Sequence, residues 1–315
     1  MQRAMTPLLL AYPGNEALAE PLRRALHADE VVFEMRRFPD GEMYLRIDSD
    51  VQNQAVAILC TLHQPDARLL PLVFMADTLR EFGAGPVGLV APYLAYMRQD
   101  QRFRPGEALT SLSFARLLSA RLDWLVTVDP HLHRRQSLAE IYSIPTAVVH
   151  AAALLAEWIR ANVTAPVVVG PDAESEQWVR AVASAVPCPH IVLEKVRHGD
   201  REVTISTIPE IGRWAGHTPV LVDDIVSSAH TMTESVRQWI DAGLSAPVCL
   251  GVHGIFAAQA YEALRAAGAA RVVTTNSIAH ASNDIDISPV LIEPVQRFLE
   301  RANGRRASNT ASARK

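Results

Sequence analysis

Short apolar runs recur along the chain and alternate with longer segments in which apolar residues return every three or four positions. Continuous apolar runs are typical of strands buried on both faces of a parallel sheet. The longer segments are typical of helices with one buried face. The main strand-like runs cover residues 8–12, 31–35, 56–59, 87–91, 124–128, 167–170, 191–196, 220–222, 248–251 and 272–277. This alternation predicts an α/β fold with mainly parallel sheets flanked by helices.

Two of these runs have the same ending. Residues 124–129 and residues 219–224 each form an apolar strand that closes with Val-Asp. Two copies of one strand–loop unit, in a chain of 315 residues, predict two similar domains. We place them at 1–146 and 147–302, and we leave open whether the final helix returns to the first domain. Residues 303–315 are polar, small and basic, so we expect a disordered tail.

Composition narrows the classes of partner. The net charge of −4 gives no electrostatic footprint for nucleic acid, and no apolar run is long enough for a membrane span. The three cysteines are far apart and form no CxxC pair, which argues against a zinc or redox motif. Reduced thiols are the default for such spacing, so we expect a cytoplasmic protein.

Residues 220–234 carry the most informative chemistry. The segment is predicted to form a strand, a loop and a helix that begins near Thr231, because Thr231 and Glu234 have capping-box spacing. A helix N-terminus suits a phosphate, and two adjacent carboxylates, Asp223 and Asp224, suit sugar hydroxyls. The loop could hold a sugar phosphate. The spacing alone fits an ordinary capped loop with solvated acids equally well.

Residues 223–231, Asp-Asp-Ile-Val-Ser-Ser-Ala-His-Thr, resemble the phosphoribosyl-pyrophosphate loop of phosphoribosyltransferases and ribose-phosphate pyrophosphokinases. Two positions depart from the family pattern, since Ser228 replaces a threonine and His230 replaces a glycine. The resemblance implies a ribose 5-phosphate site. Its residues would be Asp223, Asp224, Ser227, Ser228, Ala229, His230 and Thr231.

Two further segments resemble the pyrophosphokinases in particular. Phe38, Asp40 and Glu42 lie in a Pro-Asp-Gly turn, which by itself would be a surface hairpin. In the family this loop reaches ATP across a subunit interface, which implies a homo-oligomer, a dimer or larger, with a shared nucleotide site. Residues 92–100 match the family's Pro-Tyr-x-x-Tyr-x-Arg-Gln-Asp segment, which implies that Arg98 and Gln99 contact ATP.

A group of possible metal ligands follows the run 124–128. Asp129, His131 and His133 alternate, so an extended chain would place them on one face, a spacing that also fits zinc although no further ligand cluster of the right type is evident. The resemblance implies magnesium instead. It gives Asp129, His131 and Asp172 to the metal site and places His131 against the triphosphate of ATP. It gives His133 no role.

Lys195 and Arg197 are two positions apart on a predicted strand before the turn at 198–200. By themselves they fit an ordinary basic edge strand, and in the family such a pair is catalytic. The implied reaction transfers the β,γ-diphosphoryl group of ATP to the 1-hydroxyl of ribose 5-phosphate, which gives phosphoribosyl pyrophosphate and AMP. Two alternatives remain. Ser228 and His230 motivate a non-catalytic regulatory homologue. A phosphoribosyltransferase would explain the loop but not the other segments.

Overall fold

The computed structural model describes residues 6–172, 175–193, 195–198, 202–205, 208 and 210–312, and no side chains at 195–207 or after residue 301. It divides into two compact units. The first consists of Met1–Val149 and Ser288–Lys315, and the second is His150–Ile287. Each unit contains a parallel sheet with helices, so the predicted α/β fold class is confirmed.

The first unit is built on a six-stranded parallel sheet. In spatial order its strands are β2 (Asp29–Glu30), β1 (Leu8–Ala11), β5 (Val56–Leu59), β6 (Val87–Ala91), β7 (Leu125–Val128) and β8 (Thr146–Val149). Its helices are α1 (Glu16–Ala25), α2 (Pro65–Glu81), α3 (Thr110–Ser119), the short 3-10 turn at Leu138–Glu140 and α8 (Ser288–Ser312). Every residue of β5, β6 and β7 is buried, as expected for continuous apolar runs in a parallel sheet.

The second unit has a six-stranded parallel sheet of its own. In spatial order its strands are β10 (His190–Val192), β9 (Pro166–Gly170), β13 (Thr218–Val226), β14 (Val248–Gly254), β15 (Arg271–Thr275) and β16 (Asn283–Ile285). Its helices are α4 (Ala152–Asn162), α5 (Glu176–Ala185), the 3-10 turn Ile211–Trp214, α6 (His230–Asp241) and α7 (Ala260–Ala266). Trp239 of α6 is fully buried in its core.

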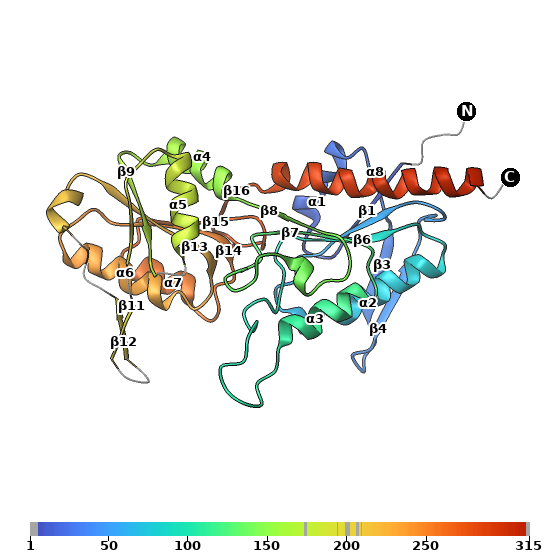
Figure 1. The fold of residues 1–315 in the computed structure, drawn as a ribbon, viewed down its shortest axis with the longest axis horizontal. Coiled ribbons are helices and arrows are strands. Elements are labelled where there is room, and N and C mark those ends of the chain that lie inside the picture. The colour runs from blue at the N-terminus through green and yellow to red at the C-terminus, as the bar shows by residue number, and fades with distance from the viewer. Residues whose placement is uncertain are drawn as a thin grey trace. The chain divides into compact units, whose positions relative to one another are not determined.

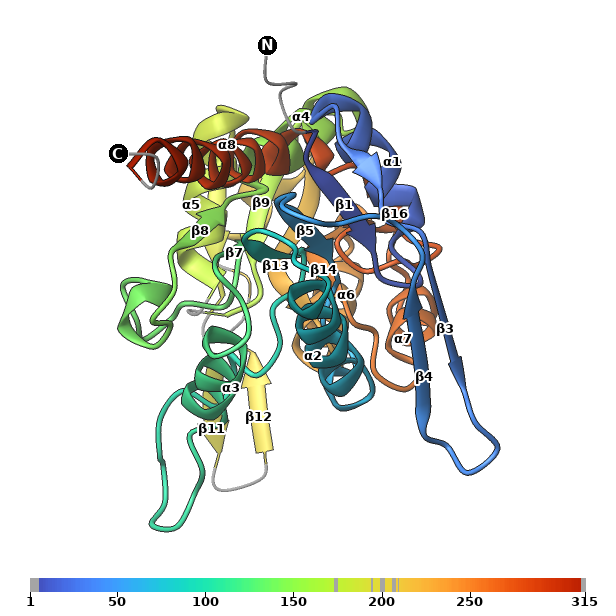
Figure 2. The same cartoon turned by 90° about the vertical axis from the view of Figure 1, so that its right-hand side faces the viewer.

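The two units repeat one topology. In each sheet the first strand along the chain lies second in the sheet, and an antiparallel hairpin separates the second strand from the next. The hairpins are β3 (Phe33–Arg37) with β4 (Met43–Ile47), and β11 (Lys195–His198) with β12 (Glu202–Ile205). Figure 2 shows both as long ribbons that extend away from their sheets. The strand order reverses between β1 and β5 and between β9 and β13, and ligands of open α/β sheets bind outside such switch points.

The central motif differs in detail from its prediction. β13 continues to Val226 and pairs with β14 up to Gly254, so Asp223 and Asp224 lie on the strand and not in the loop after it. α6 begins at His230, one residue before the predicted start, and no side chain caps it. The predicted capping box is therefore wrong. A turn of the chain at Ala229, which has a φ of 54°, starts the helix instead.

The C-terminal segment also differs from its prediction. Helix α8 continues to Ser312, where a disordered tail from residue 303 was expected. Extending an existing helix needs no new nucleus, so polar residues and a glycine can follow the helix that precedes them. In Figure 1, α8 (red) lies along the first unit, where it contacts α1, β5, β7 and β8. None of the helices in the described part of the chain has the length and apolarity that a membrane span requires.

Gly88 on β6 makes room for the side chain that anchors α8. The Trp124 ring stacks on Phe298 of α8 with a centroid distance of 5.1 Å and an interplanar angle of 7°. A Cβ atom at Gly88 would overlap that Trp124 ring. The absence of a side chain at Gly88 therefore permits the contact between sheet and helix.

We expect Gly88→Ala to lower the free energy of unfolding by about 3 kcal/mol, because the buried indole would have to move within a packed core. Urea unfolding of the full chain measures the change. Gly212→Ala is the matched control, since a Cβ there meets open space. Equal midpoints for the two variants would contradict this account of the anchor.

Candidate active site

A cluster of carboxylates lies at the switch point of the second unit. Asp223 and Asp224 are neighbours on β13, and Asp172 follows β9, the adjacent strand. Asp172 and Asp224 are buried. Burial, together with the charges of Asp224 and Asp172, raises the pKa of Asp223 well above its usual range. Such a cluster favours the binding of a cation or of hydroxyl donors.

The loop between β13 and α6 presents backbone donors beside this cluster. The amides of Phe256 and Ala257, from the turn after β14, donate to the carbonyls of Val226 and Ser227 and hold the start of the loop. Ala229 takes the left-handed conformation, so His230 is an ordinary helical residue and its side chain is exposed. The uncapped N-terminus of α6 offers N–H groups to an anion.

Asp172 is held by the turn that leads into α5. The Ser175 amide donates to Asp172 Oδ1 over 3.3 Å, and the Ser175 hydroxyl donates to the Asp172 carbonyl. Gly170 has no room for a side chain, since a Cβ would overlap the Ser175 hydroxyl. The two residues that separate Asp172 from Ser175 lie outside the described part of the chain.

Lys195 and Arg197 lie on β11, as the sequence predicted, opposite Ile205 and Val203 of β12. Only their backbone belongs to the described part of the chain, and the turn at 199–200 lies outside it. Topologically this hairpin occupies the same place in the second unit as the β3–β4 hairpin does in the first.

The predicted turn with Phe38, Asp40 and Glu42 forms the tip of the β3–β4 hairpin. The Phe38 amide donates to the Glu42 carbonyl over 2.8 Å, and the Glu42 amide donates to Asp40 Oδ1 over 3.1 Å. The Phe38 ring is 40% exposed and lies edge-on to Tyr44. An exposed ring on a hydrogen-bonded tip suits contact with another molecule, and it also suits an ordinary surface hairpin.

The loop after β6 carries Arg98, which is exposed, and Gln99, which is half-buried. The next residue, Asp100, is one to which sequence reasoning gave no role. Its buried carboxylate binds the Arg134 guanidinium at 3.0 Å, and its carbonyl accepts from Arg135 at 3.2 Å. Asp100 thus links the loop after β6 to the loop after β7. The sequence signal that could have pointed to Asp100 is the Arg-Gln-Asp triplet, which matches the family's segment.

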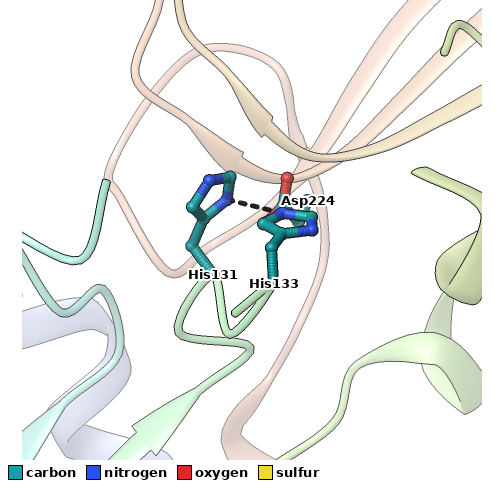
Figure 3. Close-up of side chains that lie close together, drawn as sticks. All are labelled: His131, His133 and Asp224. Atoms are coloured by element: carbon teal, nitrogen blue, oxygen red, sulfur yellow. Dashed lines mark hydrogen bonds between the residues drawn. The ribbon is translucent and has the colours of Figure 1, made fainter. Parts of the chain in front are cut away.

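The loop after β7 has a strained backbone. Asp129 and His131 take positive φ angles of 39° and 40°, which are uncommon for residues with side chains. Asp129 is buried, and its amide donates to the Val149 carbonyl. Figure 3 shows His131 and His133 turned toward each other, with His133 Nε2 3.0 Å from His131 Nδ1. His133 therefore contacts the very residue to which a role in ATP binding was assigned.

Comparisons with known proteins cover both units. Residues 8–121 match the N-terminal domain of ribose phosphate pyrophosphokinase, and residues 137–287 match the phosphoribosyl transferase domain. A crystal structure of phosphoribosylpyrophosphate synthetase from Mycobacterium smegmatis superposes with a TM-score of 0.81 at 23% identity, over 94% of this chain and 99% of that one. That structural likeness supports the fold.

Curated relatives match over nearly their whole length. The ribose-phosphate pyrophosphokinase of Methanopyrus kandleri is 31% identical over 92% of this chain and 99% of its own. The enzyme of the same name from Sulfurisphaera tokodaii is 28% identical over 91% of this chain and 100% of its own. The predicted resemblance is thus confirmed, and the chain belongs to the ribose-phosphate pyrophosphokinase family.

Proposed function

We propose that the chain transfers the β,γ-diphosphoryl group of ATP to the 1-hydroxyl of ribose 5-phosphate and releases AMP. The observation that carries the proposal is the carboxylate cluster beside an uncapped helix N-terminus, in a chain that matches the family over both units. Asp223 and Asp224 accept hydrogen bonds from the ribose hydroxyls. The segment from Ser227 to Thr231 holds the 5-phosphate with amide and hydroxyl donors.

The donor nucleotide is assigned to residues of the first unit. Arg98 and Gln99 contact the phosphates of ATP, and a planar guanidinium suits such an anion. Phe38 stacks on the adenine, while Asp40 and Glu42 position the loop. His131 donates to the triphosphate, and the His133 ring limits its orientation through the contact between the two imidazoles.

The carboxylates also fit the magnesium ion that ATP chemistry requires. Asp172 offers a carboxylate, the kind of oxygen ligand that magnesium prefers, and burial together with the charges of Asp224 and Asp172 raises the pKa of Asp223 beside it. The residues that the resemblance assigns to the cation are Asp129, His131 and Asp172. When bound, the cation would neutralise negative charge on the triphosphate. Lys195 and Arg197 stabilise the charge that develops on the transferred group.

The test of the proposed reaction is AMP release from ATP, magnesium and ribose 5-phosphate, with each component omitted in turn. AMP should form only in the complete mixture. Full-chain protein that forms no AMP but binds ribose 5-phosphate would favour the non-catalytic homologue. If the chain consumes phosphoribosyl pyrophosphate together with a nucleobase, in a mixture without ATP, the result would favour the phosphoribosyltransferase.

A shared nucleotide site predicts complementation between inactive subunits. We expect mixtures of Phe38→Ala and Lys195→Ala subunits to recover about a quarter of wild-type activity after exchange, if each site draws these two residues from different subunits and subunits pair at random. Each variant by itself should be far less active. Subunit exchange is verified with differently tagged chains, and exchange without recovery would argue against a site completed by a second copy.

His230 is not expected to block the phosphate loop. It lies within the first turn of α6, its side chain is exposed, and the left-handed position is occupied by Ala229. We expect His230→Gly to change the Kd for ribose 5-phosphate by less than about tenfold, or 1.4 kcal/mol. Calorimetry measures this. A wild type that binds nothing while His230→Gly binds would show a blocked loop and would support the regulatory alternative.

A further inference from the structure

The turn that follows β14 has a strained backbone. Phe256 takes a positive φ of 45°, and Ala258 takes one of 55°. Such angles are uncommon for residues with side chains, and in a bulky residue they persist only where the surrounding structure holds them. The angle at Phe256 therefore indicates a turn that the fold keeps in one conformation.

The turn is joined to the end of β13 by three successive amides. Those of Ile255 and Phe256 both donate to the Val226 carbonyl, over 3.0 and 2.9 Å. The next amide, that of Ala257, donates to the Ser227 carbonyl over 3.1 Å. Val226 is the last residue of β13, and Ser227 is the first residue of the loop that leads to α6. The conformation of the turn therefore fixes where this loop begins.

The Phe256 side chain is anchored in the core of the second unit. Its ring is 8% exposed and belongs to the apolar cluster that also contains Val226 and Ala229, the residues at the two ends of the loop. A Cβ atom at Gly254 would lie 2.6 Å from Phe256 Cε2, so the ring fits because Gly254 has no side chain. The strained turn and the loop are thus tied to one buried ring.

Two further rings pack against Phe256. The centroid of the His280 imidazole lies 4.5 Å from that of Phe256, and the Tyr261 centroid lies 5.4 Å from it. His280 and Tyr261 also contact each other, with centroids 4.9 Å apart. Aromatic pairs at such distances stabilise packing beyond the area that they bury. Phe256 thus has one aromatic partner from α7 and another from the segment after β15.

The His280 ring is held by the segment that follows it. The Ser282 amide donates to His280 Nδ1 over 3.1 Å, and the Ser282 hydroxyl lies 2.9 Å from the same atom. The His280 amide donates to Asn283 Oδ1 over 2.9 Å. Because an amide N–H can only donate, His280 Nδ1 accepts, and the neutral ring carries its proton on Nε2. These bonds fix the orientation of the imidazole against Phe256.

We propose that Phe256 is a positioning residue for the loop between β13 and α6, and that His280 and Tyr261 hold its ring in place. Without this support the turn would relax from its left-handed conformation and release the bonds to Val226 and Ser227. A ligand would then have to order the loop as it binds, which lowers affinity. The ligand is ribose 5-phosphate, so this step rests on the proposed function. The order of the loop in the free protein does not.

Hydrogen exchange of the full chain without ligand tests the order of the loop. Mass spectrometry of peptides that cover 223–231 and 255–260 reports how often the bonds between turn and loop open. We expect Phe256→Leu, which removes the ring and keeps an apolar side chain, to raise the exchange rate in both segments by about tenfold. Trp158→Phe is the matched control, because Trp158 is a buried aromatic residue of the same unit that bonds to Asp284. The control should leave exchange in both segments unchanged.

Calorimetry with ribose 5-phosphate tests the consequence for the site. We expect Phe256→Leu and His280→Leu each to raise the Kd by about tenfold. His280→Phe should keep the Kd within about threefold of wild type, since it retains a ring against Phe256 at a half-buried position. In steady-state assays KM for ribose 5-phosphate should rise while KM for ATP stays unchanged, a split that a general loss of stability would not produce.

The two measurements separate this inference from the proposed function. If folded Phe256→Leu has wild-type exchange or a wild-type Kd, the inference is overturned and the proposed function stands. If wild type binds no ribose 5-phosphate, the proposed site fails, and faster exchange in Phe256→Leu alone would still identify Phe256 as the residue that orders the loop. Equally fast exchange in Trp158→Phe would also overturn the inference. Urea unfolding shows which variants are folded, and His280→Leu carries the same test if Phe256→Leu is not.

Discussion

Lys195→Ala and Arg197→Ala should each lower kcat by about 30- to 1000-fold while KM for either substrate changes much less. The expected loss of about 2–4 kcal/mol per residue is typical of groups that stabilise charge only in the transition state. Both residues lie on β11, in the hairpin inserted between the second and third strands of the second unit. Steady-state AMP release with varied ATP and ribose 5-phosphate separates kcat from KM.

Arg213→Ala is the matched control for this pair. Arg213 is an exposed cation of the same unit and is paired with Glu210 at 3.1 Å. Its loss should leave kcat within about twofold, because surface ion pairs contribute little. A near-normal kcat in both β11 variants would show that Lys195 and Arg197 are not catalytic. An equal loss in the control would point to a general effect of charge on the fold.

The fold class followed from periodicity, because strands buried on both faces must be apolar throughout. The expectation of two similar halves is confirmed by the repeat of one topology. The two Val-Asp segments that suggested it are not equivalent in that repeat, because residues 125–128 form β7, whereas the counterpart of β13 in the first unit is β5. The end of β13 and the start of α6 were predicted less well. Asp223 and Asp224 look like loop residues by composition, but the ladder with β14 carries the strand through both of them to Val226.

The capping box failed for a related reason. Thr231 and Glu234 have the right spacing, yet Ala229 takes the left-handed conformation and α6 starts after it without a side-chain cap. Local spacing cannot reveal how the turn after β14 holds the loop through Val226 and Ser227. Contacts between loops far apart in sequence, such as Asp100 with Arg134, were equally invisible to a reading of local patterns.

Asp223→Asn should abolish ribose 5-phosphate binding and, at the same time, make the protein more stable at pH 7. Burial and the charges of Asp224 and Asp172 raise the pKa of Asp223 in the folded protein. The folded state therefore holds this proton more tightly than the unfolded chain, in which the pKa is about 3.9. Stability is lost as the pH rises above that value, and the loss continues until the pH has passed the raised pKa.

Asparagine keeps the shape of Asp223 and removes the charge, so the variant avoids this cost. We expect the free energy of unfolding at pH 7 to increase by about 1.4 kcal/mol for each pH unit, up to pH 7, over which the wild-type carboxyl is protonated in the folded protein and ionised in the unfolded chain. The gain should shrink as the pH falls and vanish below about pH 4, where the wild-type carboxyl is protonated in both states.

Urea unfolding across this pH range, beside calorimetry with ribose 5-phosphate, measures both effects. Glu157→Gln, an exposed carboxylate on α4, is the control and should show neither. An Asp223→Asn protein that is no more stable than wild type at pH 7 would mean that the ionised Asp223 carboxylate does not destabilise the folded protein.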